Sequence, residues 1–164
     1  MKTKYLVLGH GSHGKGTFCK LVKEVYGLDS TSSSAAAFPH ILPTIKSALD
    51  IHDKDDDWFY EHRDKNRLLW RDLILLLNTP DRTTLSRIII DQVPIYDGMR
   101  SKEEFEASKD LFDHIIWVDA SERLPPDPSM GISYTEDMIL IDNNGPESEL
   151  LRQINYLSDV FESD

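Results

Sequence analysis

The segment from Gly9 to Lys15 reads GHGSHGK and fits the spacing G-x-x-x-x-G-K of a phosphate-binding loop. Such a loop works because successive backbone N–H groups point inward at phosphate oxygens, where side chains would obstruct them. The lysine brings a positive charge to the terminal phosphates, and a following helix adds the positive end of its dipole. We therefore expect this segment to bind ATP through Gly9, Gly11, Ser12, His13, Gly14, Lys15, Gly16 and Thr17.

The position after the lysine departs from the commonest form of the loop. A serine or threonine usually stands there and meets Mg²⁺, whereas this chain has Gly16 followed by Thr17. The form G-K-G-T resembles adenylate kinases and related nucleoside monophosphate kinases, in which Mg²⁺ is held largely through water and phosphates. We expect the same here, near Thr17 and Asp97. His10 and His13 are expected to be loop residues without a metal role, since no further ligands accompany them.

Two arginines have positions that suit phosphoryl transfer, which needs positive side chains around the moving group and a site that excludes water. Arg100 lies just past the apolar segment 93–99, at the edge of a parallel sheet where ligands bind. The alternative is a turn arginine paired with a neighbouring glutamate. Arg123 opens the segment 121–137 and is either a lid arginine that closes on the phosphates or an exposed charge. With Lys15, these arginines form the predicted catalytic set.

Three further arginines are candidates for holding a second substrate. Arg63, Arg67 and Arg71 would lie near one face of a continuous helix, since each step of four residues turns only about 40° past a full revolution. That face either grips the phosphate of an acceptor nucleotide, with Arg63 and Arg67 favoured, or is a solvated face paired with nearby acidic residues. Asp97, near the end of the segment 93–99, is expected to organise water around Mg²⁺ or to orient an arginine.

The loop motif requires a buried strand before it and a helix after it, and the chain has both patterns. Residues 4–9 are apolar and β-rich, which predicts a strand buried on both faces. Apolar residues then recur at helical spacing from about Thr17 to Tyr26, and Gly27 is expected to end the helix. Three further strands are predicted over 93–99, 114–120 and 138–142.

The segments between these strands are expected to be helices or loops. Residues 30–38 are typical of a flexible loop, and 39–49 of a short helical piece broken by Pro43. The segment 121–137 is rich in proline and serine without periodicity, which predicts a long loop. Helices are predicted over about 57–78, 81–91, 102–112 and from Pro146 to about 161. The alternation predicts an α/β fold, a three-layer sandwich with a mostly parallel central sheet.

Composition limits the classes of partner. The formal net charge of −11 argues against nucleic acids, whose binding needs a basic face, but not against one small anion in a pocket. No apolar run approaches the roughly 20 residues that span a bilayer, so no membrane association is expected. The apolar run after Lys4 is expected to be a strand rather than a signal peptide. Cys19 is the single cysteine, which fits a reducing compartment, so the expected location is cytoplasmic.

Several segments together resemble the small bacteriophage-type deoxynucleoside monophosphate kinases, distant relatives of adenylate kinase among the P-loop kinases. They are, in order, 9-GHGSHGKGT-17, 32-SSSAAA-37, 98-GMRS-101, 116-IWVDASERLPP-126 and 141-IDNNG-145, and they span nearly the whole chain. The resemblance implies transfer of the γ-phosphate of ATP to a deoxynucleoside monophosphate with Mg²⁺, in the cytoplasm of a host cell if the protein is phage-encoded. Many members of this group have Asp at the position of Gly16, so this chain lacks a carboxylate close to the metal.

The resemblance also assigns parts of the chain to the substrates. Residues 1–164 would form a single P-loop kinase domain, with an acceptor-binding helical insert at about 30–91 and a lid-like loop at about 121–137. Amide or backbone groups of Asn143 and Asn144 could bind adenine, although this sequence also suits a tight turn. Related kinases are often dimeric, so a homodimer is one expectation. The acceptor-binding residues would be Ser32, Ser33, Ser34, Arg63, Arg67, Asp97 and Arg100.

Two other functions fit the same loop. One is a P-loop kinase for another small acceptor, such as a nucleoside or dephospho-coenzyme A. The other is a nucleotide-binding regulatory protein that does not catalyse transfer. The sequence does not choose the base of the acceptor, because discrimination among bases rests on a few hydrogen bonds in its pocket.

Overall fold

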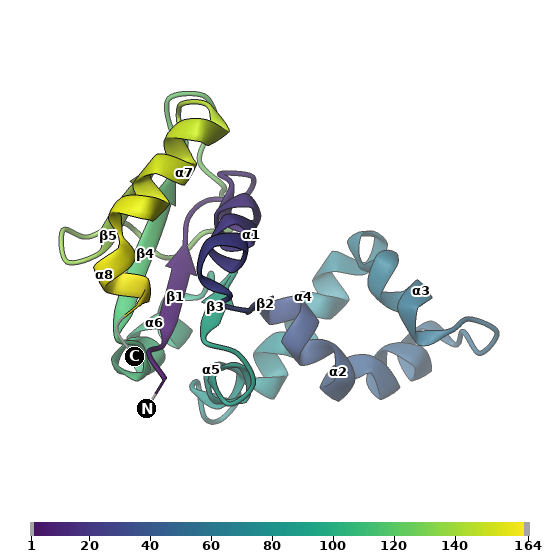
Figure 1. The fold of residues 1–164 in the computed structure, drawn as a ribbon. Helices are drawn as coiled ribbons and strands as arrows, with labels where there is room; N and C mark the ends of the chain where they lie inside the picture. Colours follow the sequence, from purple (N-terminus) through teal and green to yellow (C-terminus); the bar gives the residue numbers. More distant parts are fainter. Residues whose placement is uncertain (1, 163–164) are drawn as a thin grey trace.

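The computed structural model describes residues 2–162, and its strands form one fully parallel sheet. Their order across the sheet is β2-β3-β1-β4-β5, so the first strand lies at the centre. The phosphate loop follows β1 and therefore lies in the middle of the edge where the carboxyl ends of all the strands meet (Figure 1). This confirms the predicted α/β fold. The strands are β1 (Tyr5–Leu8), β2 (Ser30–Ser32), β3 (Ile95–Asp97), β4 (His114–Asp119) and β5 (Ile139–Asp142).

Apolar clusters cover both faces of the sheet, because successive side chains of a strand point to opposite sides. Tyr5 and Val7 of β1 belong to a cluster with α1 (Lys15–Tyr26), α7 (Glu147–Tyr156) and α8 (Ser158–Phe161). Leu6 and Leu8 belong to the other cluster, with α5 (Thr84–Ile90) and α6 (Lys102–Ser108). The result is the three-layer arrangement that the sequence predicts.

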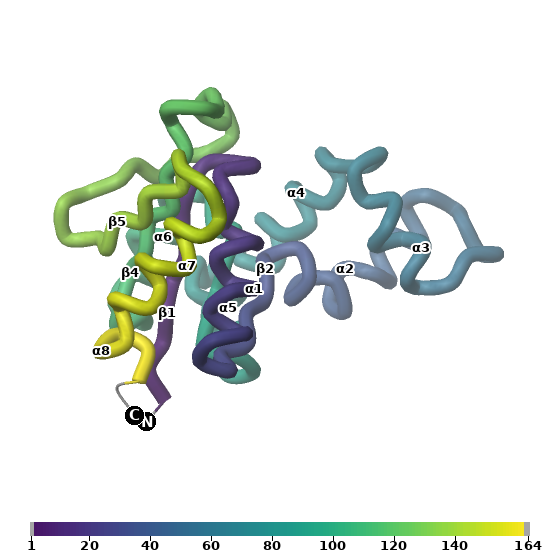
Figure 2. Tube along the Cα trace, turned by 45° about the horizontal axis from the view of Figure 1, so that its top comes forward, coloured from purple at the N-terminus to yellow at the C-terminus, as the bar shows by residue number. Residues whose placement is uncertain are grey.

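Helices α2 (Ser33–Leu49), α3 (Asp56–Glu61) and α4 (Arg67–Leu77) project beyond the β2 edge of the sheet, as Figures 1 and 2 both show. Their buried residues Ile45, Phe59 and Trp70 belong to the same apolar cluster as α5 and α6. The projecting helices therefore share a core with one face of the sheet. Among residues 2–162, no helix is both long and apolar enough to cross a membrane.

Two predictions for the region 30–49 were wrong. Residues 30–38 are not a flexible loop: they form β2 and the start of α2, which Ser32 caps by accepting a hydrogen bond from the N–H of Ala35 at 3.3 Å. Nor does Pro43 break the helix, since α2 runs through both Pro39 and Pro43. Both prolines are exposed, so they lie on the outer face of the helix.

The single helix predicted over 57–78 is also wrong, because the structure has three pieces there. A 3₁₀ turn, Arg63–Asn66, separates α3 from α4. Side chains bind carbonyl groups at the end of α3: His62 Nδ1 is 2.8 Å from the carbonyl oxygen of Trp58, and Arg63 donates to that of Tyr60 at 2.9 Å. The carbonyl oxygen of Trp58 also accepts from the backbone N–H of His62 at 3.0 Å, so these side chains add bonds at the end of α3. A second 3₁₀ turn, Lys109–Leu111, follows α6.

Candidate active site

In the loop between β1 and α1, close contacts leave no room for a side chain at two glycines. Gly9 has a φ of +146°, and a Cβ added there would lie 2.4 Å from the carbonyl oxygen of Val118 on β4. Gly14 has a φ of +97°, and its Cβ would lie 2.1 Å from Nδ2 of Asn143. The loop backbone therefore carries no side chain at these two positions, and it leads into the N-terminus of the twelve-residue helix α1. This arrangement fits a bound phosphate.

Lys15 is the first residue of α1, and its side chain folds back over the loop. Its ammonium donates to the carbonyl oxygens of Gly9 at 2.8 Å and His10 at 2.9 Å. Burial, and then the nearby charge of Arg100, lower the pKa of Lys15. The lysine is therefore already positioned at the loop that it is expected to serve.

Asp97 ends β3 beside this loop and lies in register with Ser32 of β2 and Val7 of β1. Burial raises the pKa of Asp97, and the charge of Lys15 opposes that shift. Among the described residues, no group of three or more His, Cys, Asp or Glu side chains could hold a metal ion. That Mg²⁺ is held mainly through phosphates and water, near Thr17 and Asp97, stays a prediction.

Arg100 follows β3, and the segment 121–137 holds it. The guanidinium donates to the carboxylate of Asp127 and to the hydroxyl of Ser129. The carbonyl oxygen of Arg100 accepts from the N–H of Gly131 at 2.9 Å. Arg100 is thus tied to the long loop rather than to the glutamates that follow it, and sequence reasoning did not identify its partner Asp127.

The two loop histidines join the phosphate loop to residues 120–127, a role that the sequence did not indicate. His13 is fully buried: its Nδ1 accepts from the N–H of Ala120 at 3.0 Å, and its Nε2 lies 3.2 Å from the carbonyl oxygen of Pro125. His10 Nδ1 accepts from the N–H of Asp127 at 3.0 Å. A neutral imidazole suits this position because it offers one acceptor and one donor.

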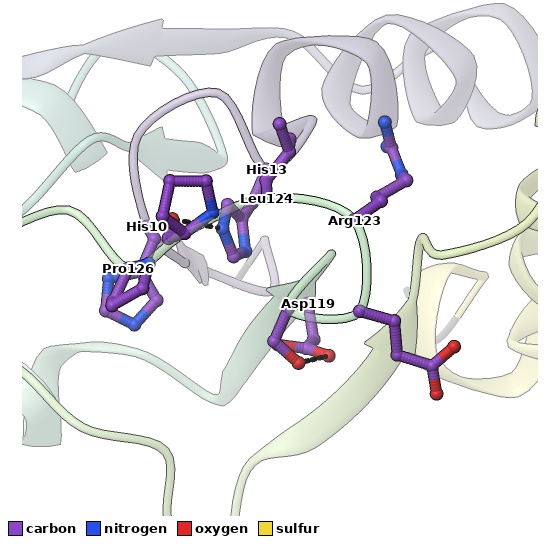
Figure 3. A pocket seen from close by; sticks show the side chains of 9 residues that line it. His10, His13, Asp119, Arg123, Leu124 and Pro126 are labelled. Carbon is purple, nitrogen blue, oxygen red and sulfur yellow. Dashed lines mark hydrogen bonds between the residues drawn. The ribbon is translucent and has the colours of Figure 1, made fainter.

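An open pocket of about 450 Å³ lies beside these histidines, lined also by Asp119 and by the segment 121–126. Figure 3 shows this segment arching past His13, with His10 to one side and Arg123 to the other. Arg123 is exposed, and its Nε donates to the carbonyl oxygen of Asn143 at 2.8 Å. The predicted lid arginine therefore lines a space next to the phosphate loop.

The turn after β5 supports both loops. Asn143 is 6% exposed, and its Nδ2 donates to the carbonyl oxygen of His13 at 2.8 Å. Asn144 accepts from the N–H of Glu122 through Oδ1 at 2.9 Å. The amide groups of both residues are engaged by the chain itself, and their contact with adenine remains a prediction.

The serines expected to line an acceptor site lie at the same edge of the sheet. Ser33 donates to the carbonyl oxygen of Gly98 at 3.4 Å, and Oγ of Ser32 lies 3.2 Å from Oγ of Ser34. Gly98 directly follows Asp97 and precedes Arg100 by two residues. The start of α2 therefore faces the turn that carries the predicted charged residues.

Arg63 does not share a helix face with Arg67 and Arg71, because it lies in the 3₁₀ turn that precedes α4, and α4 carries the other two. Arg63 packs over the ring of Tyr60, 4.3 Å from its centroid. Arg67 Nε is 4.0 Å from Asp64, and Arg71 donates to Asp72 at 2.8 Å. The prediction of one helix face for all three arginines was therefore wrong, and an acceptor role for Arg63 or Arg67 stays a prediction.

No family model matches the sequence, and no curated protein matches it. Among solved structures, a gluconokinase from Sinorhizobium meliloti is similar, with 14% identity over 98% of this chain and 94% of that chain and a TM-score of 0.52. A sugar kinase from Janibacter sp. has 16% identity over 96% and 95% of the two chains and a TM-score of 0.48. A putative kinase from Chloroflexus aurantiacus has 16% identity over 98% and 96%, and a TM-score of 0.48. The first likeness shows that this chain shares its fold with that gluconokinase.

Proposed function

We propose that this chain transfers the γ-phosphate of ATP to a small acceptor, and that the acceptor is a deoxynucleoside monophosphate. The observation that carries the proposal is that Lys15, Asp97 and Arg100 lie close together at the glycine-rich loop. The serines at the start of α2 lie at the same edge of the sheet. Phosphoryl transfer is mostly positioning and charge neutralisation, and these residues provide both.

Each part of the site then has a role. The loop N–H groups and the N-terminus of α1 hold the phosphates of ATP, and Lys15 stabilises the charge that develops on the moving group. Arg100 and Arg123 bind phosphate oxygens from the opposite side. Asp97 would hold water bound to Mg²⁺, which would supply neutralisation of the phosphate charge. The first turn of α2 and its serines receive the acceptor.

The test is a panel of acceptors incubated with ATP and Mg²⁺ and read by product mass. It includes deoxynucleoside monophosphates, nucleosides, dephospho-coenzyme A and gluconate, the last because of the Sinorhizobium meliloti gluconokinase. We expect ADP and a deoxynucleoside diphosphate. Product from another acceptor alone would contradict the assignment of the acceptor, and ATP binding without turnover on any acceptor would indicate a regulatory protein.

Lys15→Ala is the matching test of the loop. We expect the rate of transfer to fall by at least about a hundredfold, because the charge on the moving group loses its partner. Lys20→Ala is the control: it removes the same charge from α1, at an exposed position 3.8 Å from Glu24. Equal rates for the two variants would contradict a role for the lysine of the loop.

A further inference from the structure

The phosphate loop contacts an anion that belongs to the chain itself, the carboxylate of Asp127. A Cβ added at Gly11 would lie 2.6 Å from Oδ2 of Asp127 and 3.7 Å from Nη2 of Arg100. The carboxylate therefore lies against the backbone of Gly11, and the guanidinium of Arg100 donates to it. Asp127 thus lies next to two groups that a phosphoryl oxygen would use, the loop backbone and an arginine.

The carboxylate is also fixed from its own loop. Its Oδ1 accepts from the backbone N–H of Ser129 at 2.9 Å and from the Ser129 hydroxyl at 2.7 Å, while its own N–H donates to His10. These bonds from Ser129, together with the charge of Arg100, lower the pKa of Asp127 to about 2. The side chain is only 18% exposed. At neutral pH it is therefore an ordered carboxylate facing the loop.

We propose that Asp127 is an internal competitor for the phosphate site: a nucleotide phosphate binds by displacing this carboxylate from Gly11 and Arg100. The two anions exclude each other because they need the same donors and would repel at close range. The segment 126–129 then acts as a latch over the loop. The inference rests on the proposed function in one respect, that nucleotide phosphates bind at this loop.

The way the long loop is attached allows such an exchange. Ile132 and Met138 are buried in the apolar cluster on the α5 side, and the N–H of Gly131 is bonded to the carbonyl oxygen of Arg100. Pro126, Pro128 and Ser129, by contrast, are exposed, and this part of the loop meets the site through polar contacts of Asp127 and Ser129. The latch can leave while the rest of the loop stays docked, since no apolar core has to open.

The affinity for ATP tests the proposal directly. Asp127→Asn removes the charge of the competitor while keeping its size, and Asp137→Asn removes a charge from the same loop at an exposed residue beside Thr135. Titration calorimetry is performed with ATP, with inorganic triphosphate, and with each in the presence and absence of Mg²⁺. We expect Asp127→Asn to tighten binding by roughly tenfold, because the apparent Kd falls as the binding-competent fraction rises. Asp137→Asn should bind like the wild type.

Unchanged or weaker binding by Asp127→Asn would overturn the proposal. If Asp127→Asn lost affinity only in the titrations with Mg²⁺, the proposal would also be overturned, since the carboxylate would then be a metal ligand. Ser129→Ala is a second variant that loosens the carboxylate without removing it, and it should tighten binding in the same direction. In the wild type, ATP should increase hydrogen exchange at the Ser129 amide, and protection there would count against the latch.

The failures of the two proposals are distinguishable, because binding is measured without turnover. If Asp127→Asn binds ATP more tightly than the wild type but the protein phosphorylates no acceptor, the latch proposal stands and the proposed function is overturned. If the protein transfers phosphate, and if Asp127→Asn and Ser129→Ala both bind ATP like the wild type, only the latch proposal is overturned. If neither the wild type nor Asp127→Asn binds ATP or triphosphate, both proposals are overturned.

Discussion

Gly14 and Gly16 flank Lys15 and should respond in opposite ways to the same substitution. A Cβ at Gly14 would lie 2.1 Å from the Asn143 amide, at a φ that side chains rarely adopt, whereas a Cβ at Gly16 meets nothing within 4 Å. We expect Gly14→Ala to lower the free energy of unfolding by about 2–4 kcal/mol. Gly16→Ala lies in a helix and should raise it by up to about 1 kcal/mol. Urea denaturation of both variants measures the difference.

A similar loss of stability in both glycine variants would contradict the loop geometry described above. A second comparison separates stability from binding. Gly14→Ala should also bind ATP more weakly, since its loop cannot keep the path that exposes the N–H groups, while Gly16→Ala should retain binding. Loss of binding by Gly16→Ala alone would show that the residue next to Lys15 is in close contact with the nucleotide.

The sequence predicted the phosphate loop and the charged residues Asp97 and Arg100, but it did not indicate the residues that contact them across the fold. Gly9 to Lys15 are recognisable because the loop needs glycines and a lysine at fixed spacing. Asp127 has no such signal: it is one aspartate in a proline-rich segment, and its importance comes from contact with Gly11 and Arg100. The histidine contacts with residues 120–127 are equally non-local.

At the scale of elements, the errors have physical reasons. β2 is three polar residues long, so no apolar alternation marks it, and it exists because its backbone pairs with β3. The break between α3 and α4 coincides with contacts of the His62 and Arg63 side chains to carbonyl groups, which hydrophobic spacing does not reveal. β1 and β4, by contrast, are apolar runs in the centre of the sheet and were predicted to within two residues.

The prolines of α2 lead to a prediction about stability. Pro43 is exposed inside a helix whose opposite face is buried through Ala37, Ile41 and Ile45. Pro43→Ala should raise the free energy of unfolding by about 1–2 kcal/mol, because it restores a helix hydrogen bond and loses only part of that gain to a more flexible unfolded chain. Ser47→Ala, at another exposed position of α2, is the control and should change stability by only about 0.5 kcal/mol. A destabilised Pro43→Ala would mean that the helix depends on its proline.

Glu104 leads to a prediction about pH, since this buried carboxyl joins α6 to β3. Tyr96 donates its hydroxyl to Oε1 of Glu104 at 2.9 Å, and burial raises the pKa of Glu104 above its ordinary value. The native protein therefore holds this proton more tightly than the unfolded chain, so the charged form destabilises the fold and acidification relieves the effect. Glu104→Gln should be more stable than the wild type at neutral pH, and the difference should shrink as the pH falls through the raised pKa.

Thermal unfolding measured from neutral to acidic pH checks this, with Glu103→Gln as the control. Glu103 is the adjacent, exposed residue, and hydrogen bonds from its own backbone and from Ser101 lower the pKa of its carboxyl. Its charged form is favoured in the native state, so the sign of its pH dependence is opposite. A Glu104→Gln variant that loses stability at neutral pH would show that the charge-assisted bond to Tyr96 outweighs burial.

At the scale of the whole molecule, one apolar cluster connects the projecting helices with the sheet. Trp70 of α4 and Phe59 of α3 belong to the same buried cluster as Leu6 and Leu8 of β1. The strand that carries the phosphate loop is thus packed, through one continuous core, against the helices proposed to receive the acceptor. A substitution in that core can alter both substrate sites without touching either one.

The net charge of −11 gives the last prediction, because it opposes the approach of an anionic nucleotide. The positive groups at the loop are few, and Arg100 is paired with Asp127, so repulsion should dominate at long range. We expect the association rate constant for a fluorescent ATP analogue, measured by stopped flow, to rise about twofold as ionic strength increases to about 0.15 M, where the Debye length is roughly 8 Å. Replacing Asp53 and Asp57 with lysine, on the exposed segment before and within α3, should raise the rate at low salt and flatten its salt dependence. A rate that falls with salt in the wild type would show instead that Lys15 and its neighbouring arginines attract the nucleotide from beyond the site.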